Sequence, residues 1–108
     1  MTMISERDRN ILNQFASCLK VRYPDTRVWL FGSRARGDAQ DDSDFDMCIV
    51  MDIMDKERNT AINDIAWEVA FDNGTVITTV RYTREEFETG PRSKSPLTKN
   101  ILREGVRA

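Results

Sequence analysis

The sequence contains no histidine, only two cysteines and no long apolar run. The absence of histidine excludes a Ser-His-Asp triad, a histidine general base and a histidine-ligated metal. Cys18 and Cys48 form no Cys-x-x-Cys motif, and we expect two buried thiols in a reducing cytosol rather than a disulfide. Any bound metal must then be held by oxygen atoms, which favours a hard cation such as Mg²⁺.

No apolar stretch is as long as a membrane span, and the first residues lack the apolar region of a signal peptide. We therefore expect a cytoplasmic protein that does not enter a membrane. The formal net charge of −2 argues against a protein that grips nucleic acid through bulk positive charge, and we expect no nucleic-acid partner.

The length and composition are those of one ordinary globular domain. The chain has 108 residues, of which 40% are hydrophobic and 31% are charged. A chain of this size can bury one core and has little room for a second. We therefore expect residues 1–108 to form a single domain.

Short apolar patterns alternate with polar loops along the chain. Ser5 and Asp8 resemble a helix capping box with aspartate in the acidic position, and Gly74 is well placed to cap the end of a later helix. The wholly apolar run 28–31 suits a strand that is buried on both faces. The patterns predict helices over residues 5–20, 55–72, 83–87 and 97–103, and strands over residues 28–31, 45–51 and 75–82. This order predicts an α+β fold, in which a small mixed β-sheet is covered by helices.

Aspartates crowd the segment before the second strand. Asp44 and Asp46 are two residues apart where that strand begins, so both side chains point to the same face. Two convergent carboxylates repel each other, and a bound Mg²⁺ relieves the repulsion. The other three aspartates of the segment are expected on the loop surface: Asp38, Asp41 and Asp42.

Gly32 and Ser33 follow the first strand directly. A glycine at this point lets the backbone turn sharply and approach a ligand closely. Residues 33–36 then predict a helical turn whose free N–H groups face an anion, with the Ser33 hydroxyl as a further donor. Arg34 and Arg36 add positive charge, and each either contacts a phosphate or pairs with a nearby aspartate. One short loop thus joins an anion-binding turn to a pair of metal-binding carboxylates, which is the equipment for holding a Mg-NTP complex.

The pattern Gly32-Ser33, ten residues, then Asp44-x-Asp46 resembles the signature of the minimal nucleotidyltransferases of the DNA polymerase β superfamily. The string GSRARGDAQDDSDFD is similar to the form found in bacteria and archaea. The resemblance implies a palm-like nucleotidyltransferase fold with helices on one side of a small mixed sheet. It also implies transfer of a nucleoside monophosphate from an NTP to a hydroxyl, with release of pyrophosphate. By position, Gly32 and Ser33 would hold the triphosphate, and Asp44 and Asp46 would bind two Mg²⁺.

The resemblance further implies a partner. Minimal nucleotidyltransferases are often encoded beside a HEPN-type toxin, and they act as antitoxins, some by adenylylating a tyrosine of the toxin. For this chain it implies AMP transfer from ATP to a HEPN-type partner. A small-molecule nucleotidyltransferase is disfavoured, because such enzymes generally carry an additional domain.

One departure from the family pattern leaves a second function open. Active members often place a third carboxylate on the next strand, where this sequence has threonines, and the first acid after them is Glu85. The alternative is therefore a catalytically weak or inactive module that binds nucleotide or partner and neutralises the partner by binding. Residues 75–80 could also lie at a sheet edge and pair with another copy of the chain.

Overall fold

The computed structural model describes residues 4–40 and 42–108, so Asp41 lies outside the described residues. Its helices are α1 (Glu6–Arg22), α2 (Ser33–Arg36), α3 (Lys56–Asn73), α4 (Arg84–Glu88), the 3₁₀ helix η1 (Pro91–Lys94) and α5 (Pro96–Glu104). Its strands are β1 (Arg27–Phe31), β2 (Phe45–Met51), β3 (Ile77–Thr83) and β4 (Val106–Arg107).

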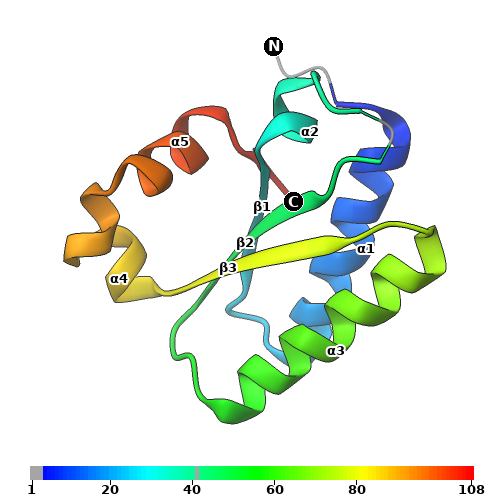
Figure 1. Cartoon of the computed structure of the whole chain (residues 1–108). Helices are drawn as coiled ribbons and strands as arrows, with labels where there is room; N and C mark the ends of the chain where they lie inside the picture. Colours follow the sequence, from blue (N-terminus) through cyan, green and yellow to red (C-terminus); the bar gives the residue numbers. More distant parts are fainter. Residues whose placement is uncertain (1–3, 41) are drawn as a thin grey trace.

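The strands form one mixed sheet in the order β3-β2-β1-β4 (Figure 1). Strand β1 runs antiparallel to both β2 and β4, whereas β2 and β3 are parallel. The parallel pair requires a crossover, which α3 supplies. The expectation of a small mixed sheet within an α+β fold is confirmed, and β3 lies at a sheet edge as expected.

Helices cover both faces of the sheet. One face packs against α1 and α3 and forms the larger core, in which Phe45, Met47 and Ile49 of β2 are fully buried. The other face packs against α4 and α5 through Trp29, Tyr82, Phe87 and Ile101, with further side chains of β2. Figure 1 shows α1 and α3 together on one side of the strands and α4 and α5 on the other. The expectation of helices on one side only is therefore wrong.

The predicted helix caps are present, whereas the third strand is shorter than predicted. Gly74 caps α3 in the left-handed conformation, with a φ of 62°. Thr83 and Glu86 form the capping box of α4. The third strand begins at Ile77 rather than at residue 75, because Gly74 and the next residue complete the turn out of α3. The two-residue strand β4 has no sequence pattern of its own, and it forms by pairing with β1.

The two cysteines differ in environment. Cys48 is fully buried in β2, and burial raises the pKa of its thiol to about 12, so the thiol stays protonated at neutral pH. Cys18 is free and exposed on α1, which contradicts the expectation that both thiols are buried. None of the helices formed by residues 4–40 and 42–108 combines the length and the apolar composition that a membrane span requires.

Truncation of a core leucine tests how firmly α1 holds the sheet. Leu19 of α1 is fully buried, whereas Leu102 of α5 is 57% exposed. Leu19→Ala is expected to lower the free energy of unfolding by about 2–5 kcal/mol, because it removes apolar contacts and leaves a cavity. The matched change Leu102→Ala should cost no more than about 0.5 kcal/mol. Urea denaturation of both variants measures the difference, and equal losses would contradict the assigned core.

Candidate functional site

Three neighbouring strands place Phe31, Asp46 and Thr78 in one line across the sheet. In the strand register, Phe31 of β1 pairs with Asp46 of β2, and Asp46 pairs with Thr78 of β3. The Thr78 hydroxyl donates a hydrogen bond of 2.7 Å to Asp46 Oδ1. Gly32 follows Phe31 and lies against the other carboxylate oxygen of Asp46. Gly32, Asp44, Asp46 and Thr78 are called the site cluster from here on.

The two aspartates of the site cluster flank a buried anchor. Phe45 opens β2 and is fully buried in the core beneath α1 and α3. Asp44 precedes it and is exposed, and Asp46 follows it and is half-buried. Because side chains alternate along extended backbone, Asp44 and Asp46 project away from the side that Phe45 occupies. The anchor thus presents both carboxylates at the sheet end where Gly32 lies.

The backbone at Gly32 explains why a glycine stands there. Its φ of 77° and ψ of −155° lie where residues with a side chain are strained. A Cβ built at this position would collide with Asp46 Oδ2 and would lie 3.3 Å from Asp46 Cγ. The absent side chain therefore allows the turn after β1 to approach the Asp46 carboxylate.

Helix α2 begins immediately after this turn, as residues 33–36 predicted. The first turn of a helix leaves N–H groups without intrahelical partners, so the turn can accept an anion. Arg36 at its end pairs with Asp38 at 3.4 Å and with Glu104 of α5 at 3.7 Å. These are exposed ion pairs of small strength, so the Arg36 guanidinium can leave them for a stronger anion.

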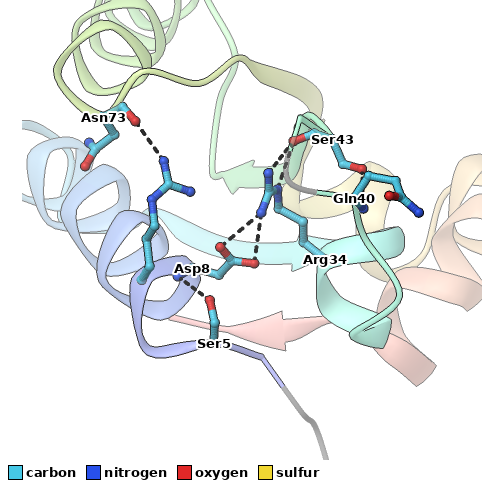
Figure 2. Close-up of polar contacts among 7 residues, drawn as sticks. Ser5, Asp8, Arg34, Gln40, Ser43 and Asn73 are labelled. Atoms are coloured by element: carbon cyan, nitrogen blue, oxygen red, sulfur yellow. Dashed lines mark hydrogen bonds and ion pairs between the residues drawn. The ribbon is translucent and has the colours of Figure 1, made fainter.

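Arg34 occupies a different environment from Arg36. Its side chain is 6% exposed and contacts Asp8 of α1, which is 7% exposed as a residue. Arg34 Nη1 donates to Asp8 Oδ1 and Oδ2 at 3.1 and 3.3 Å, while Nε and Nη2 donate to the Ser43 carbonyl at 2.9 and 2.7 Å. Figure 2 shows the Arg34 guanidinium between the Asp8 carboxylate and the Ser43 carbonyl. The guanidinium also stacks over the Phe45 ring, at 4.1 Å from the ring centroid.

These contacts make Arg34 a positioning residue. It belongs to α2, it bonds the residue just before Asp44, and it stacks on the residue between the two aspartates. It therefore fixes the distance between the turn that follows β1 and the two carboxylates. The expectation that Arg34 contacts a phosphate stays a prediction without a test, and the aspartate with which it pairs is Asp8 of α1 rather than a nearby aspartate of the loop.

The partner of Arg34 was missed by sequence reasoning. The sequence predicts Asp8 as the acidic member of a capping box with Ser5, and the Asp8 backbone N–H does donate to Ser5 Oγ at 3.0 Å. Its carboxylate, however, turns to Arg34 instead of the helix end. An aspartate on the apolar side of a helix was the available signal, because a buried carboxylate requires a cationic partner.

The donor set fits Mg²⁺ only when a substrate completes it. Among the described residues, no group of three or more His, Cys, Asp or Glu side chains gathers as a metal site. Asp38 and Asp42 are exposed on the loop, as expected. Mg²⁺ in proteins commonly takes one or two carboxylates and fills its other positions with phosphate oxygens and water. Asp44 and Asp46 would supply the two carboxylates, and a bound triphosphate would supply the phosphate oxygens.

The strand register shows which residue of β3 lies opposite Asp46, where a third carboxylate could join the pair. The residue of β3 opposite Asp46 is Thr78, which donates a hydrogen bond where a third carboxylate would supply a ligand. Thr79 pairs with Met47 and lies on the other face of the sheet. Glu85 lies beyond the strand in α4, as expected.

A cavity of about 410 Å³ lies beside the Arg34–Asp8 pair, between α1 and the loop after α2. Neither Asp44 nor Asp46 is among its lining residues, so it is separate from the site cluster. The residues that line it are Ser5, Arg7, Asp8, Arg34, Gly37, Ala39 and Gln40.

Comparison with known proteins identifies a sequence family and several similar folds. A family model described as "Nucleotidyltransferase domain" matches residues 12–107. No curated protein sequence matches the chain.

Three solved structures resemble the chain in fold. A mutant of the toxin–antitoxin MntA-HpeT aligns with a TM-score of 0.59 and 20% identity, over 88% of this chain and 69% of that one. A toxin–antitoxin with AMP-PNP aligns with a TM-score of 0.59 and 22% identity, over the same shares of 88% and 69%. A protein classed as a minimal nucleotidyltransferase aligns with a TM-score of 0.55 and 24% identity, over 93% of this chain and 87% of that one.

Replacement of Asp8 tests how much the buried Asp8–Arg34 ion pair stabilises the folded chain. Asp8→Ala is expected to lower the free energy of unfolding by about 3–5 kcal/mol, because it leaves the Arg34 charge buried without that carboxylate. The matched change Asp38→Ala removes an exposed partner of Arg36 and should cost less than about 1 kcal/mol. Chemical denaturation measures both, and a negligible loss for Asp8→Ala would show that Arg34 is held by its other contacts.

Proposed function

Because the chain belongs to the nucleotidyltransferase domain family, we propose that it transfers a nucleoside monophosphate, AMP from ATP, to a hydroxyl of a partner protein. The observation that carries the proposal is the register of the site cluster. Gly32, in the turn that follows β1, lies against the carboxylate of Asp46 in the neighbouring strand β2. A triphosphate on the turn therefore lies within reach of the carboxylates.

In the proposed reaction, the acceptor hydroxyl oxygen attacks the α-phosphorus of ATP. A bond between the acceptor oxygen and the α-phosphorus forms, which gives a phosphodiester, and the bond between the α-phosphorus and the bridging oxygen breaks. Pyrophosphate leaves with the electron pair, and the proton of the acceptor hydroxyl passes to solvent. The N-terminal turn of α2 and the Ser33 hydroxyl hold the triphosphate, and Arg36 neutralises part of its charge. Arg34 keeps the turn and the two carboxylates in fixed positions through its contacts with Ser43 and Phe45.

Asp44 and Asp46 are assigned to hold Mg²⁺, two ions by resemblance to the family. When bound, the metal polarises phosphoryl oxygens and neutralises charge on the leaving pyrophosphate. The Asp46 carboxylate is oriented for this task by the Thr78 hydroxyl on one oxygen and by the close approach of Gly32 at the other. The carboxylate that binds metal is thus already positioned before substrate arrives.

The proposed partner is a toxin of the HEPN type, and the proposed biological role is that of an antitoxin. Two of the similar structures are toxin–antitoxin proteins, and one of them was solved with AMP-PNP, an analogue of ATP. The sequence identities are only 20% and 22%, so these similar structures motivate the proposal. The labelling experiment below tests it.

A second candidate function follows from Thr78. Threonine cannot accept the proton of the acceptor hydroxyl near neutral pH, and it is a poor metal ligand. The alternative is a module that binds Mg-ATP or the toxin and neutralises the toxin by steric blockade, without turnover.

Transfer of label from ATP labelled at the α-phosphate distinguishes the two functions. The purified chain is incubated with Mg²⁺, labelled ATP and the protein encoded beside it. We expect label on that protein, and we expect Asp44→Ala/Asp46→Ala to reduce the labelling by about 100-fold or more, because the metal contributes several kcal/mol to the transition state.

The control for the same assay is binding of Mg-ATP measured by calorimetry. Label that is equally strong with the double variant would contradict the assigned site. No label together with Mg-ATP binding to the unmodified chain would favour the binding module over the enzyme.

Restoring the third acid tests the assignment of Thr78. Thr78→Asp is expected to raise the transfer rate by about 100-fold, the usual contribution of a general base. The matched control Thr79→Asp adds the same charge one residue later, on the opposite face of the sheet, and should not raise the rate. Initial rates of label transfer measure both, and a gain for Thr79→Asp alone would contradict the register of β3.

A further inference from the structure

Strand β3 has an edge that no strand of the described residues covers. It lies at the end of the sheet, seven residues long, and contains neither proline nor lysine. Natural sheets usually protect such an edge with proline, lysine, a bulge or a covering segment, because exposed strand edges pair with other chains. The length and composition of β3 leave it suited to accept a further strand.

The backbone direction shows which groups face the open edge. The Val76 carbonyl accepts from the Phe45 N–H, so it points toward β2. N–H and C=O directions alternate along a strand, so the N–H groups of Ile77, Thr79 and Arg81 point to the open side. At the far end, Arg92 Nη1 donates to the Arg81 carbonyl at 2.9 Å, so the available stretch runs from Ile77 to Arg81.

A groove of about 430 Å³ lies beside this stretch, between β3 and α3. Its wall on α3 includes Trp67 and Phe71, which are stacked at 5.2 Å and are 67% and 72% exposed. Val76 continues the apolar surface at 55% exposure. Large apolar side chains gathered this way on a surface mark a site of interaction. We call this feature the edge groove.

The other end of the edge groove carries a positive charge without a carboxylate. Arg81 donates to neutral acceptors: Thr79 Oγ1 at 3.2 Å, Asn59 Oδ1 at 2.7 Å, the Asn59 carbonyl and Asn63 Oδ1. Within residues 4–40 and 42–108, Arg81 forms no ion pair with an aspartate or a glutamate. Burial lowers the pKa of Arg81 from its ordinary value, as expected for a cation that lacks a compensating anion.

We propose that the edge groove binds an extended, acidic segment of a partner protein, which adds as a strand beside Ile77–Arg81. A residue of that segment places an apolar side chain against Trp67 and Phe71, and another places a carboxylate on Arg81. Ile77 and Arg81 are four residues apart, or about 13 Å at 3.3 Å per residue. The bound segment therefore carries its apolar and acidic residues four positions apart on the same face. This proposal goes beyond nucleotidyl transfer and does not depend on it.

The charge of β3 favours a partner protein over a second copy of this chain. Pairing of β3 with β3 would extend the sheet, and the two Trp67–Phe71 pairs could meet. However, residues Ile77–Thr83 contain no acid, so neither Arg81 would gain a carboxylate from the opposing strand. Two like charges would instead share one face of the joined sheet. A foreign acidic strand satisfies both the backbone edge and the guanidinium.

A designed peptide tests the proposal on the full chain. The probe is a capped peptide with a central phenylalanine, a glutamate four positions to either side, and valine and threonine between, so that it fits in both strand directions. A matched peptide has lysine in place of both glutamates. Amide NMR is expected to show slowed hydrogen exchange at Ile77, Thr79 and Arg81 with the glutamate peptide, and about tenfold weaker binding of the lysine peptide.

Variants assign the contacts. Arg81→Gln keeps hydrogen-bonding capacity but removes the charge, so the preference for the glutamate peptide should disappear. Trp67→Ala/Phe71→Ala should weaken both peptides, whereas Val21→Ala, which truncates a side chain that is 83% exposed on α1, should weaken neither. Asp44→Ala/Asp46→Ala should bind the peptide like the unmodified chain, so failure of the transfer chemistry would leave this test intact.

Three results would overturn the proposal. One is equal binding of the two peptides to the unmodified chain, and another is binding without any effect on the β3 amides. The third is slowed exchange of the same amides without peptide that rises with protein concentration, which would identify a second copy as the occupant.

Discussion

The geometry of the candidate site depends on one buried guanidinium. Arg34 joins three segments that are distant in sequence: α1 through Asp8, the turn after β1 through its own backbone, and the start of β2 through Ser43 and Phe45. A buried charge is tolerated only with partners, so the cost of leaving Arg34 unpaired keeps these segments together. The same contacts set the position of Asp44, which follows Ser43 directly. A core interaction and a functional constraint are thus carried by one side chain.

The sheet separates packing from chemistry by its two-residue period. Along β2, the side chains of Phe45, Met47 and Ile49 enter the core beneath α1 and α3, while Asp46 lies on the opposite face with Cys48. That second face is apolar where α4 and α5 cover it and becomes polar at the end where Asp46 and Thr78 meet. The carboxylate therefore stands on a rigid strand with a packed core behind it, which limits its movement without burying it.

The features that could be predicted from the sequence are those that depend on neighbouring residues. Capping residues, the glycine after the first strand and the alternation around Phe45 act over a few residues, so the helix ends and the presentation of Asp44 and Asp46 could be predicted. Contacts between distant segments could not. The pairing of Asp8 with Arg34, the second helical layer and strand β4 arise when the chain folds back on itself, and no pattern of neighbouring residues specifies them.

The residue at position 78 affects both catalysis and the charge repulsion in the metal-free site. A third carboxylate opposite Asp46 would place like charge beside Asp44 and Asp46, and without a bound metal this repulsion would destabilise the chain. A hydroxyl at that position removes the repulsion and gives Asp46 a hydrogen bond instead. The site is therefore more stable without metal than a three-acid site would be, at the loss of a group that could accept the acceptor's proton.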